Sequence, residues 1–387
     1  RGGLTDNTIN GTGLGNPSTT QLYANLVDSA TGLVRNVVAV TAGTGVYTIS
    51  DSVNANTGYQ IIISTTQGTI GSSAPSASLP TNWVNVGEQY GSNNASGTGI
   101  ESGTPNGIIR AHTISNNITS VNFGIDQRPA GTDKTAASQV NPGGTVKVQT
   151  PSLAATDLED GTKGTGSWFI INTLPTKGIL YYNNVAITAG DTIKNYDSTK
   201  LTVDPTFNGS GTLSFTFTSL DSAKIGDASP NTITMPFTSL TIGGTVFDDR
   251  GGLTDNTING TGLGNPSSTQ LYANLVNVAT GNVVNVATVT AGTGVYTISD
   301  SINASTAYRI VISTTQGTIG SAAPSASIPT NWVNVGEQFG TNNSAGTGIE
   351  TGTPNGTILV TTGASSNIAS VNFGIDQRPV GTDKTAA

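Results

Sequence analysis

The sequence predicts an all-β protein made of tandem β-sandwiches arranged end to end. Apolar residues occur in short runs rich in Val, Ile and Tyr, and clusters of Gly, Asn, Ser and Thr separate these runs as turns do. No stretch carries an apolar stripe with helical spacing over the length of a helix. A long part of the chain also occurs twice, which indicates a repeated structural unit.

Internal repetition sets the predicted domain organisation. Residues 1–107 match residues 250–356 at most positions, and after one inserted residue 120–137 match 370–387. Between the two copies lies a segment of different sequence. The predicted units are A (1–130), B (131–242), a second A (243–380) and the start of a further B (381–387).

The first A unit starts inside the motif that opens the second. The stretch "GTVFDDRGGLTDNTINGTG" begins at Gly244, whereas Arg1 begins directly with "RGGLTDNTINGTG". We therefore expect the chain to be a window from a longer A–B array with a period of about 250 residues. The segment "TIGGTVF" (241–247) is predicted to be the first strand of the second A sandwich, and the first A unit lacks its equivalent.

Each A unit reads as a series of short strands. "QLYANLV" from Gln21 alternates Leu22, Ala24 and Leu26 with Tyr23 and Asn25, the period of a half-buried strand. Substitutions between the copies, such as Ile62 to Val311, roughly keep side-chain volume, as a packed core requires. The further predicted strands are "NVVAVT" at Asn36, "GVYTIS" at Gly45, "YQIIIS" at Tyr59 and "SVNFGI" at Ser120.

The B unit is predicted to be a second, different β-sandwich. "GSWFIINTLPTKGILYYNN" at Gly166 reads as two strands around a Pro/Gly turn. "KLTVDPTFNGSGTLSFTFTSLDS" at Lys200 reads as two strands around an Asn-Gly loop. "NTITMPF" at Asn231 completes the sandwich.

Composition limits the possible functions. The formal net charge is −8, so the chain lacks the basic surface that nucleic-acid binding needs. No apolar run approaches the roughly 18 residues of a membrane helix, so we expect no membrane span in this segment. Cysteine is absent, which leaves core packing and bound metal as sources of stability. The acidic groups favour cations as ligands.

The motifs of both units resemble those of bacterial surface proteins. The A unit resembles the B-type repeat of serine-aspartate repeat proteins through "GTVFDD", "GGLTDNTINGTG", "AGTGVYTI" and "NFGI". The B unit resembles cadherin-like domains of giant adhesins through "DLEDG", "LPTKGILYYNN" and "DPTFNGSGTLSFTFTSLD". Their alternation is similar to the long repetitive surface proteins of Bacteroidota exported by type IX secretion, including gliding adhesins.

This resemblance implies immunoglobulin-like or cadherin-like sandwiches in an extracellular, cell-surface adhesin, with a non-enzymatic role as a structural stalk stiffened by calcium. Its partners would be neighbouring repeats and a surface or glycan ligand. A stretch or subunit of an extracellular filament, in which chains also associate laterally, is the first alternative. A carbohydrate-binding module is the second, with Tyr47, Trp83 and Tyr90 as its aromatic platform, although single aromatics on strands more often belong to the core.

The acidic loops are the predicted metal sites. Carboxylate and amide oxygens on a flexible Gly-rich loop suit Ca²⁺, although Asp and Asn also serve simply as turn formers. In B the cadherin resemblance points to Asp157, Glu159, Asp160 and Asp221, for which surface solvation is the alternative. In A the candidates are Asp248, Asp249, Asp255, Asn259 and Glu337, with Asp6, Asn10 and Glu88 as the first-copy equivalents.

Catalysis and modification leave weaker signals. His112 is the only histidine and has no counterpart in the second A copy, which disfavours a Ser-His-Asp enzyme. Asp followed by Ser or Thr resembles the O-glycosylation acceptor of Bacteroidota, although such pairs also arise by chance in a Ser/Thr-rich chain. The acceptors would be Ser29, Ser52, Thr192, Ser198, Ser222 and Ser301.

Overall fold

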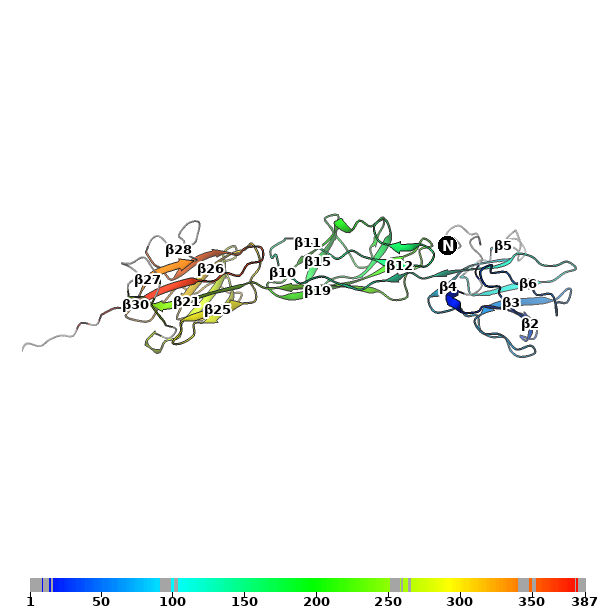
Figure 1. Cartoon of the computed structure of the whole chain (residues 1–387), viewed down its shortest axis with the longest axis horizontal. Coiled ribbons are helices and arrows are strands. Elements are labelled where there is room, and N and C mark those ends of the chain that lie inside the picture. Colours follow the sequence, from blue (N-terminus) through cyan, green and yellow to red (C-terminus); the bar gives the residue numbers. More distant parts are fainter. Residues whose placement is uncertain are drawn as a thin grey trace, which may run out of the picture.

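The computed structural model confirms the all-β prediction. In the described residues the regular elements are β-strands and three short 3₁₀-helices, and no helix has the length and apolarity to cross a membrane. Three sandwich-like units lie in a row (Figure 1), each with its own hydrophobic core. The structure describes residues 17–90, 99–100, 104–250, 260–263, 266–339, 348–349 and 353–379, with 9, 14, 258 and 381.

The first A unit has two facing sheets, ordered β2-β1-β3-β6 and β5-β4-β7. Leu22, Ala24 and Leu26 point into the core as predicted. Its elements are η1 (Pro17–Thr19), β1 (Tyr23–Asp28), β2 (Val34–Ala39), β3 (Gly58–Ser64), β4 (Trp83–Tyr90), β5 (Gly99–Ile100), β6 (Ile108–His112) and β7 (Val121–Gln127).

One detail of β1 differs from the prediction of a strand with a polar outer face. Asn25 is fully buried, because the loop after β3 covers the outer face of the sheet. The Asn25 side chain holds that loop: its Oδ1 accepts from Gly68 N at 2.8 Å, and its Nδ2 donates to Ile62 O at 3.3 Å. A buried amide with both of its polar ends bonded is tolerated in a core.

The B unit is built on a different plan. One sheet has the order β10-β20-β19-β14-β17 with β9 also on β20, a second has the order β11-β18-β15-β16, and a small third has the order β13-β12-β8. Phe169 packs edge-on against Tyr196 and Phe217 in the core, at ring distances of 5.1 and 5.7 Å.

The strands of the B unit are β8 (Ala130–Gly131), β9 (Lys134–Thr135), β10 (Gln139–Val140), β11 (Val148–Gln149), β12 (Ala155–Asp157), β13 (Gly161–Lys163), β14 (Trp168–Thr173), β15 (Gly178–Tyr182), β16 (Val185–Ala186), β17 (Thr192–Ile193), β18 (Leu201–Pro205), β19 (Gly211–Leu220) and β20 (Asn231–Thr238). The 3₁₀-helix η2 (Ser198–Lys200) precedes β18.

The second A unit repeats the first and adds a strand. Its sheets are ordered β24-β23-β26-β29 and β22-β21-β30-β27-β28, with β25 also on β21. Its elements are β21 (Thr241–Asp248), β22 (Thr261–Gly262), η3 (Pro266–Ser268), β23 (Tyr272–Asn277), β24 (Val283–Thr288), β25 (Val295–Ser299), β26 (Ala307–Ser313), β27 (Trp332–Phe339), β28 (Gly348–Ile349), β29 (Thr357–Thr361) and β30 (Val371–Gln377).

Strand β21 explains a difference between the two A copies. "GVYTIS" was predicted as a strand in both, but it is a strand only in the second copy, as β25. There it pairs antiparallel with β21, with Ile242 opposite Ile298. In the first copy no described strand offers residues 46–50 a backbone partner, so the same sequence stays irregular. Strand formation here depends on a partner rather than on propensity.

Both joints between units are short. After β7, strand β8 already belongs to the B unit, where Gly131 lies opposite Ala155. Arg128 Nη1 also donates to Gly226 O across this joint at 2.7 Å. Only Ser239 and Leu240 separate β20 of B from β21 of the second A unit. Such joints restrict the relative motion of the units.

Candidate metal centre at the first joint

Acidic side chains from both units gather where the first A unit meets B. Asp126 ends β7 of A, Asp157 ends β12, Glu159 follows in the next turn, and Asp221 follows β19. Asp126, Asp157 and Asp221 are all buried, at 3%, 8% and 2% exposure. Buried carboxylates need a charge partner or several hydrogen bonds, because the interior solvates them poorly.

Hydrogen bonds satisfy only one oxygen each of Asp157 and Asp221. Asp157 Oδ1 accepts from the backbone N–H groups of Glu159 and Asp160 at 2.9 and 2.7 Å. Asp221 Oδ1 accepts from Ile225 N at 2.8 Å. The Oδ2 atom of each is buried without a hydrogen-bond partner, as is Oε2 of Glu159. Three unpartnered anionic oxygens therefore belong to neighbouring residues of one cluster.

The electrostatics show that these carboxylates interact. Burial raises the pKa of Glu159 to about 7, and the charges of Asp126 and Asp157 add to this rise. Burial likewise raises the pKa of Asp221 to about 6, with contributions from Asp126, Asp157 and Asp160. Like charges held close in a poorly solvated place disfavour ionisation. A bound cation would reverse that balance.

Asp160 has a different role from the other three predicted B ligands. Its Oδ2 accepts from Lys163 Nζ and Ser222 N at 2.8 and 2.7 Å. Burial raises its pKa, but these bonds outweigh burial and leave the pKa at about 2. Asp160 is therefore a fixed anion that braces the turn and adds negative charge to the cluster.

The donor set fits a hard cation. Ca²⁺ takes six to eight oxygen ligands, and carboxylates with free oxygens are its usual protein ligands. Within the described residues, no group of three or more acidic or histidine side chains already stands in a metal-holding arrangement. Binding would therefore require the side chains of Asp126, Asp157, Glu159 and Asp221 to close on the ion.

Sequence reasoning predicted three of these four residues and missed Asp126. Its signal was present, because Asp126 lies in "NFGIDQRP" directly before the joint. Asp227, also missed, lies nearby on the same joint and bonds to Asn231. Burial raises its pKa to about 6. An acidic residue at the end of a unit's last strand indicates a role at the joint only when the next unit also presents acids there.

The predicted A sites are only partly described. Asp6, Asn10, Asp255 and Asn259 lie outside the described residues. Asp249 is buried beside Gly374, and Asp248 Oδ2 lies 3.4 Å from Arg250 Nη2. Asp248 and Arg250 share a hollow of 320 Å³ with Gln377 and with Asp376, the second-copy counterpart of Asp126.

Glu88 and Glu337 hold a loop in their respective A units. Glu337 Oε1 accepts from Asn355 N at 2.6 Å and also from Gly356 N. Glu88 Oε1 makes the equivalent bonds to Asn106 and Gly107. Both glutamates are buried. A buried carboxylate that accepts two backbone N–H groups is well suited to fixing a loop.

The remaining sequence candidates are mostly surface or core residues. Trp83 is buried, and Tyr47 and Tyr90 pack against the core, so these three form no exposed platform. Among the acceptor candidates, Ser29, Ser52, Thr192 and Ser222 are exposed, whereas Ser198 and Ser301 are half-buried.

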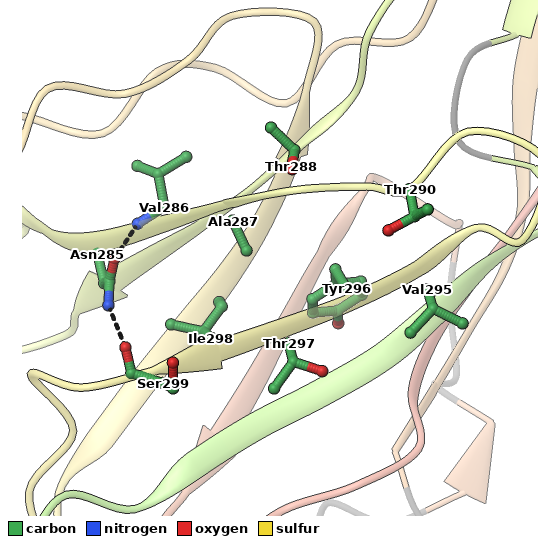
Figure 2. A pocket seen from close by; sticks show the side chains of 10 residues that line it. All are labelled: Asn285, Val286, Ala287, Thr288, Thr290, Val295, Tyr296, Thr297, Ile298 and Ser299. Carbon is green, nitrogen blue, oxygen red and sulfur yellow. Dashed lines mark hydrogen bonds between the residues drawn. The ribbon is translucent and has the colours of Figure 1, made fainter.

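The largest pocket offers little chemistry. It is a hollow of 560 Å³ between β24 and β25, where the two sheets of the second A unit part (Figure 2). Asn285 bridges its end, donating to Ser299 O at 2.8 Å and accepting from Val286 N at 2.7 Å. Its lining contains no Asp, Glu, His, Lys or Arg, so it supplies neither a charged ligand nor an acid–base pair.

Comparison with protein-family models gives no match for this chain, and comparison with curated proteins gives none either.

Proposed function

We propose that this chain is a non-enzymatic segment of an extracellular stalk, in which calcium bound at the A–B joint stiffens a row of β-sandwiches. The observation that carries the proposal is the pair of buried, unpartnered oxygens, Asp157 Oδ2 and Asp221 Oδ2, beside Asp126 of the preceding unit. Ligands from both sides of a joint would couple the units when the ion binds.

The arrangement of the units supports the same role. Three sandwiches in a row give length without enlarging any one core (Figure 1). Short, hydrogen-bonded joints transmit that length as a rod. A bacterial surface adhesin of the kind that the sequence resembles would use such a rod to hold a binding region away from the cell.

The test is calcium binding by the whole chain. Isothermal titration should show saturable binding of Ca²⁺, and Ca²⁺ should raise the melting temperature relative to EGTA because only the native state assembles the site. Asp221→Asn should weaken binding at least tenfold, because it removes an anionic ligand. Asp191→Asn, an exposed residue of the same unit, is the matched control and should bind normally.

Small-angle scattering tests the mechanical part. In Ca²⁺ the maximum dimension should be better defined than in EGTA, and Asp221→Asn should remove the difference. Binding that Asp221→Asn leaves unchanged would place calcium elsewhere, and no saturable binding would refute the calcium role.

An extracellular filament in which chains also associate is a second candidate function. The observation that favours it is the unpaired edge of β7 in the described first A unit. Open strand edges promote association between chains.

A further inference from the structure

The first A unit carries the groove that β21 fills in the second. In the second unit, β21 lies between β25 and β30 (Figure 1). Its first half pairs antiparallel with β25, and its second half pairs parallel with β30, with Val246 opposite Phe373. Ile242 and Val246 are both fully buried. This one strand therefore closes the space between the two sheets.

The corresponding surface of the first unit has the same sequence but lacks that cover. Strand β7 matches β30 and pairs only with β4 among the described strands. Phe123 and Ile125 are half-buried, whereas their counterparts Phe373 and Ile375 are at most 1% exposed. Core side chains and a row of backbone groups thus face an open edge, which is the usual template for strand addition.

The floor of this groove is already formed. Tyr47 Oη donates to Val121 O at 2.7 Å, just as Tyr296 Oη donates to Val371 O at 2.6 Å in the filled unit. This bond links residues 46–50 to β7 and sets the groove's width. A strand would therefore find the groove in its bound shape, which lowers the cost of binding.

Two asparagines flank the groove and would recognise the strand's backbone. In the second unit, Asn367 Oδ1 accepts from Thr241 N at 2.9 Å, and Asn372 Oδ1 accepts from Thr245 N at 3.0 Å. Their counterparts in the first unit, Asn117 and Asn122, are exposed. The clips for an incoming strand are thus present and accessible.

Steric fit selects which strand can enter. A Cβ atom on Gly244 would lie 1.7 Å from Val371 O, far inside contact distance, and one on Gly243 would lie 3.2 Å from Tyr296 O. Only a strand with glycine at the Gly244 position passes the tyrosine bridge. Apolar residues two before and two after it, as Ile242 and Val246 are, fill the core on either side.

We propose that the first A unit takes up, from another molecule, an extended segment with the sequence of Thr241–Asp248. The segment binds parallel to β7 in the register of β21, with Ile242 opposite Ile49 and Val246 opposite Phe123. Residues 46–50 then become a strand, as β25 is in the second unit. The interaction joins chains by strand addition, with main-chain bonds for affinity and the glycine pair for specificity.

A labelled peptide of residues 239–250 tests the proposal on the whole chain. Fluorescence anisotropy should show saturable binding with one peptide per chain, because the groove of the second A unit is filled. The peptide with Gly244→Val should bind at least tenfold more weakly. Because this substitution is in the peptide, misfolding of the receptor cannot explain the loss.

Hydrogen exchange locates the bound peptide. Amides of residues 46–50 and 121–125 should gain protection, whereas those of 295–299 and 371–375 should not change. A variant with residues 239–249 grafted before Arg1 should lose peptide binding, because the graft occupies the groove. Absence of saturable binding, equal binding of the Gly244→Val peptide, or protection confined to the second unit would each overturn the proposal.

Discussion

Asn303 of the second A unit donates from Nδ2 to Asn208 Oδ1 of the B unit at 2.8 Å. The same side chain accepts from Gly209 N at 2.9 Å, so both ends of its amide bind one loop of B. It is only 3% exposed. On the B side, buried Asn141 holds that loop by donating to Phe207 O and Gly209 O. The second joint is thus fixed by paired amides, without charge.

Removing this amide should loosen the joint. Asn303→Ala leaves Gly209 N and Asn208 Oδ1 without their partner, at a cost of about 1–3 kcal/mol for buried polar groups. Urea denaturation should show the second A unit and B unfolding less cooperatively. Asn54→Ala, the counterpart in the first A unit with an exposed side chain, is the control and should change stability little. Equal effects of the two substitutions would contradict the role of the joint.

The acidic cluster should make stability depend on pH in a calcium-sensitive way. The folded pKa values of Glu159, about 7, and Asp221, about 6, lie above their ordinary values. The folded state therefore holds more protons than the unfolded state between about pH 4 and pH 7, and stability falls as pH rises through this window. In EGTA the melting temperature should fall from pH 5 to pH 7.5.

Calcium should flatten or reverse this pH profile. Ca²⁺ binds the ionised carboxylates, so its affinity and its stabilisation should both increase with pH. Asp221→Asn and Glu159→Gln should flatten the profile measured in EGTA, because they remove the titrating groups. A profile that keeps its slope in both variants would show that other residues control it.

Glu337 should stabilise its loop independently of metal. Glu337→Gln weakens the charge-assisted bonds to Asn355 N and Gly356 N, and we expect a loss of about 1.5–3 kcal/mol. The loss should be the same in Ca²⁺ and in EGTA, as judged by thermal melting. Glu88→Gln should have the same effect in the first A unit. A loss seen only in Ca²⁺ would instead support the metal role predicted from the sequence.

Gly244 should be nearly irreplaceable in the second A unit. A Cβ there collides with a carbonyl of β30, so Gly244→Ala should displace β21 and cost at least about 2 kcal/mol. Gly363→Ala in the same unit meets nothing within 4 Å and is the control. Circular dichroism with urea measures both. Equal stability of the two variants would contradict the close approach of β21 to β30.

The sequence predicted the fold class well because alternation and turn residues are local signals. It identified Ile242 and Val246 as inward-facing on a first strand, and Leu22, Ala24 and Leu26 as core. It failed where a distant partner decides the outcome. Asn25 is buried because a loop covers it, and "GVYTIS" is irregular in the first copy because no described strand lies beside it.

The candidate site shows the same limit. Asp157, Glu159 and Asp221 were found because they belong to one unit's motifs, whereas Asp126 comes from the preceding unit. The amides of Asn141, Asn208 and Asn303 carry no composition signal, since asparagine is common in turns throughout the chain. Only the packing of one unit against the next gives them their role.

The pairing of β21 with β30 has a mechanical consequence. These strands begin and end the second A unit and run parallel, with hydrogen bonds between them. Tension along the row pulls β21 toward the B unit and β30 the opposite way, so the bonds are loaded in shear and must break together rather than one by one. The strand that completes this unit is thus also the element that would resist its being torn open, and single-molecule pulling of Gly244→Ala should reveal a weaker unit.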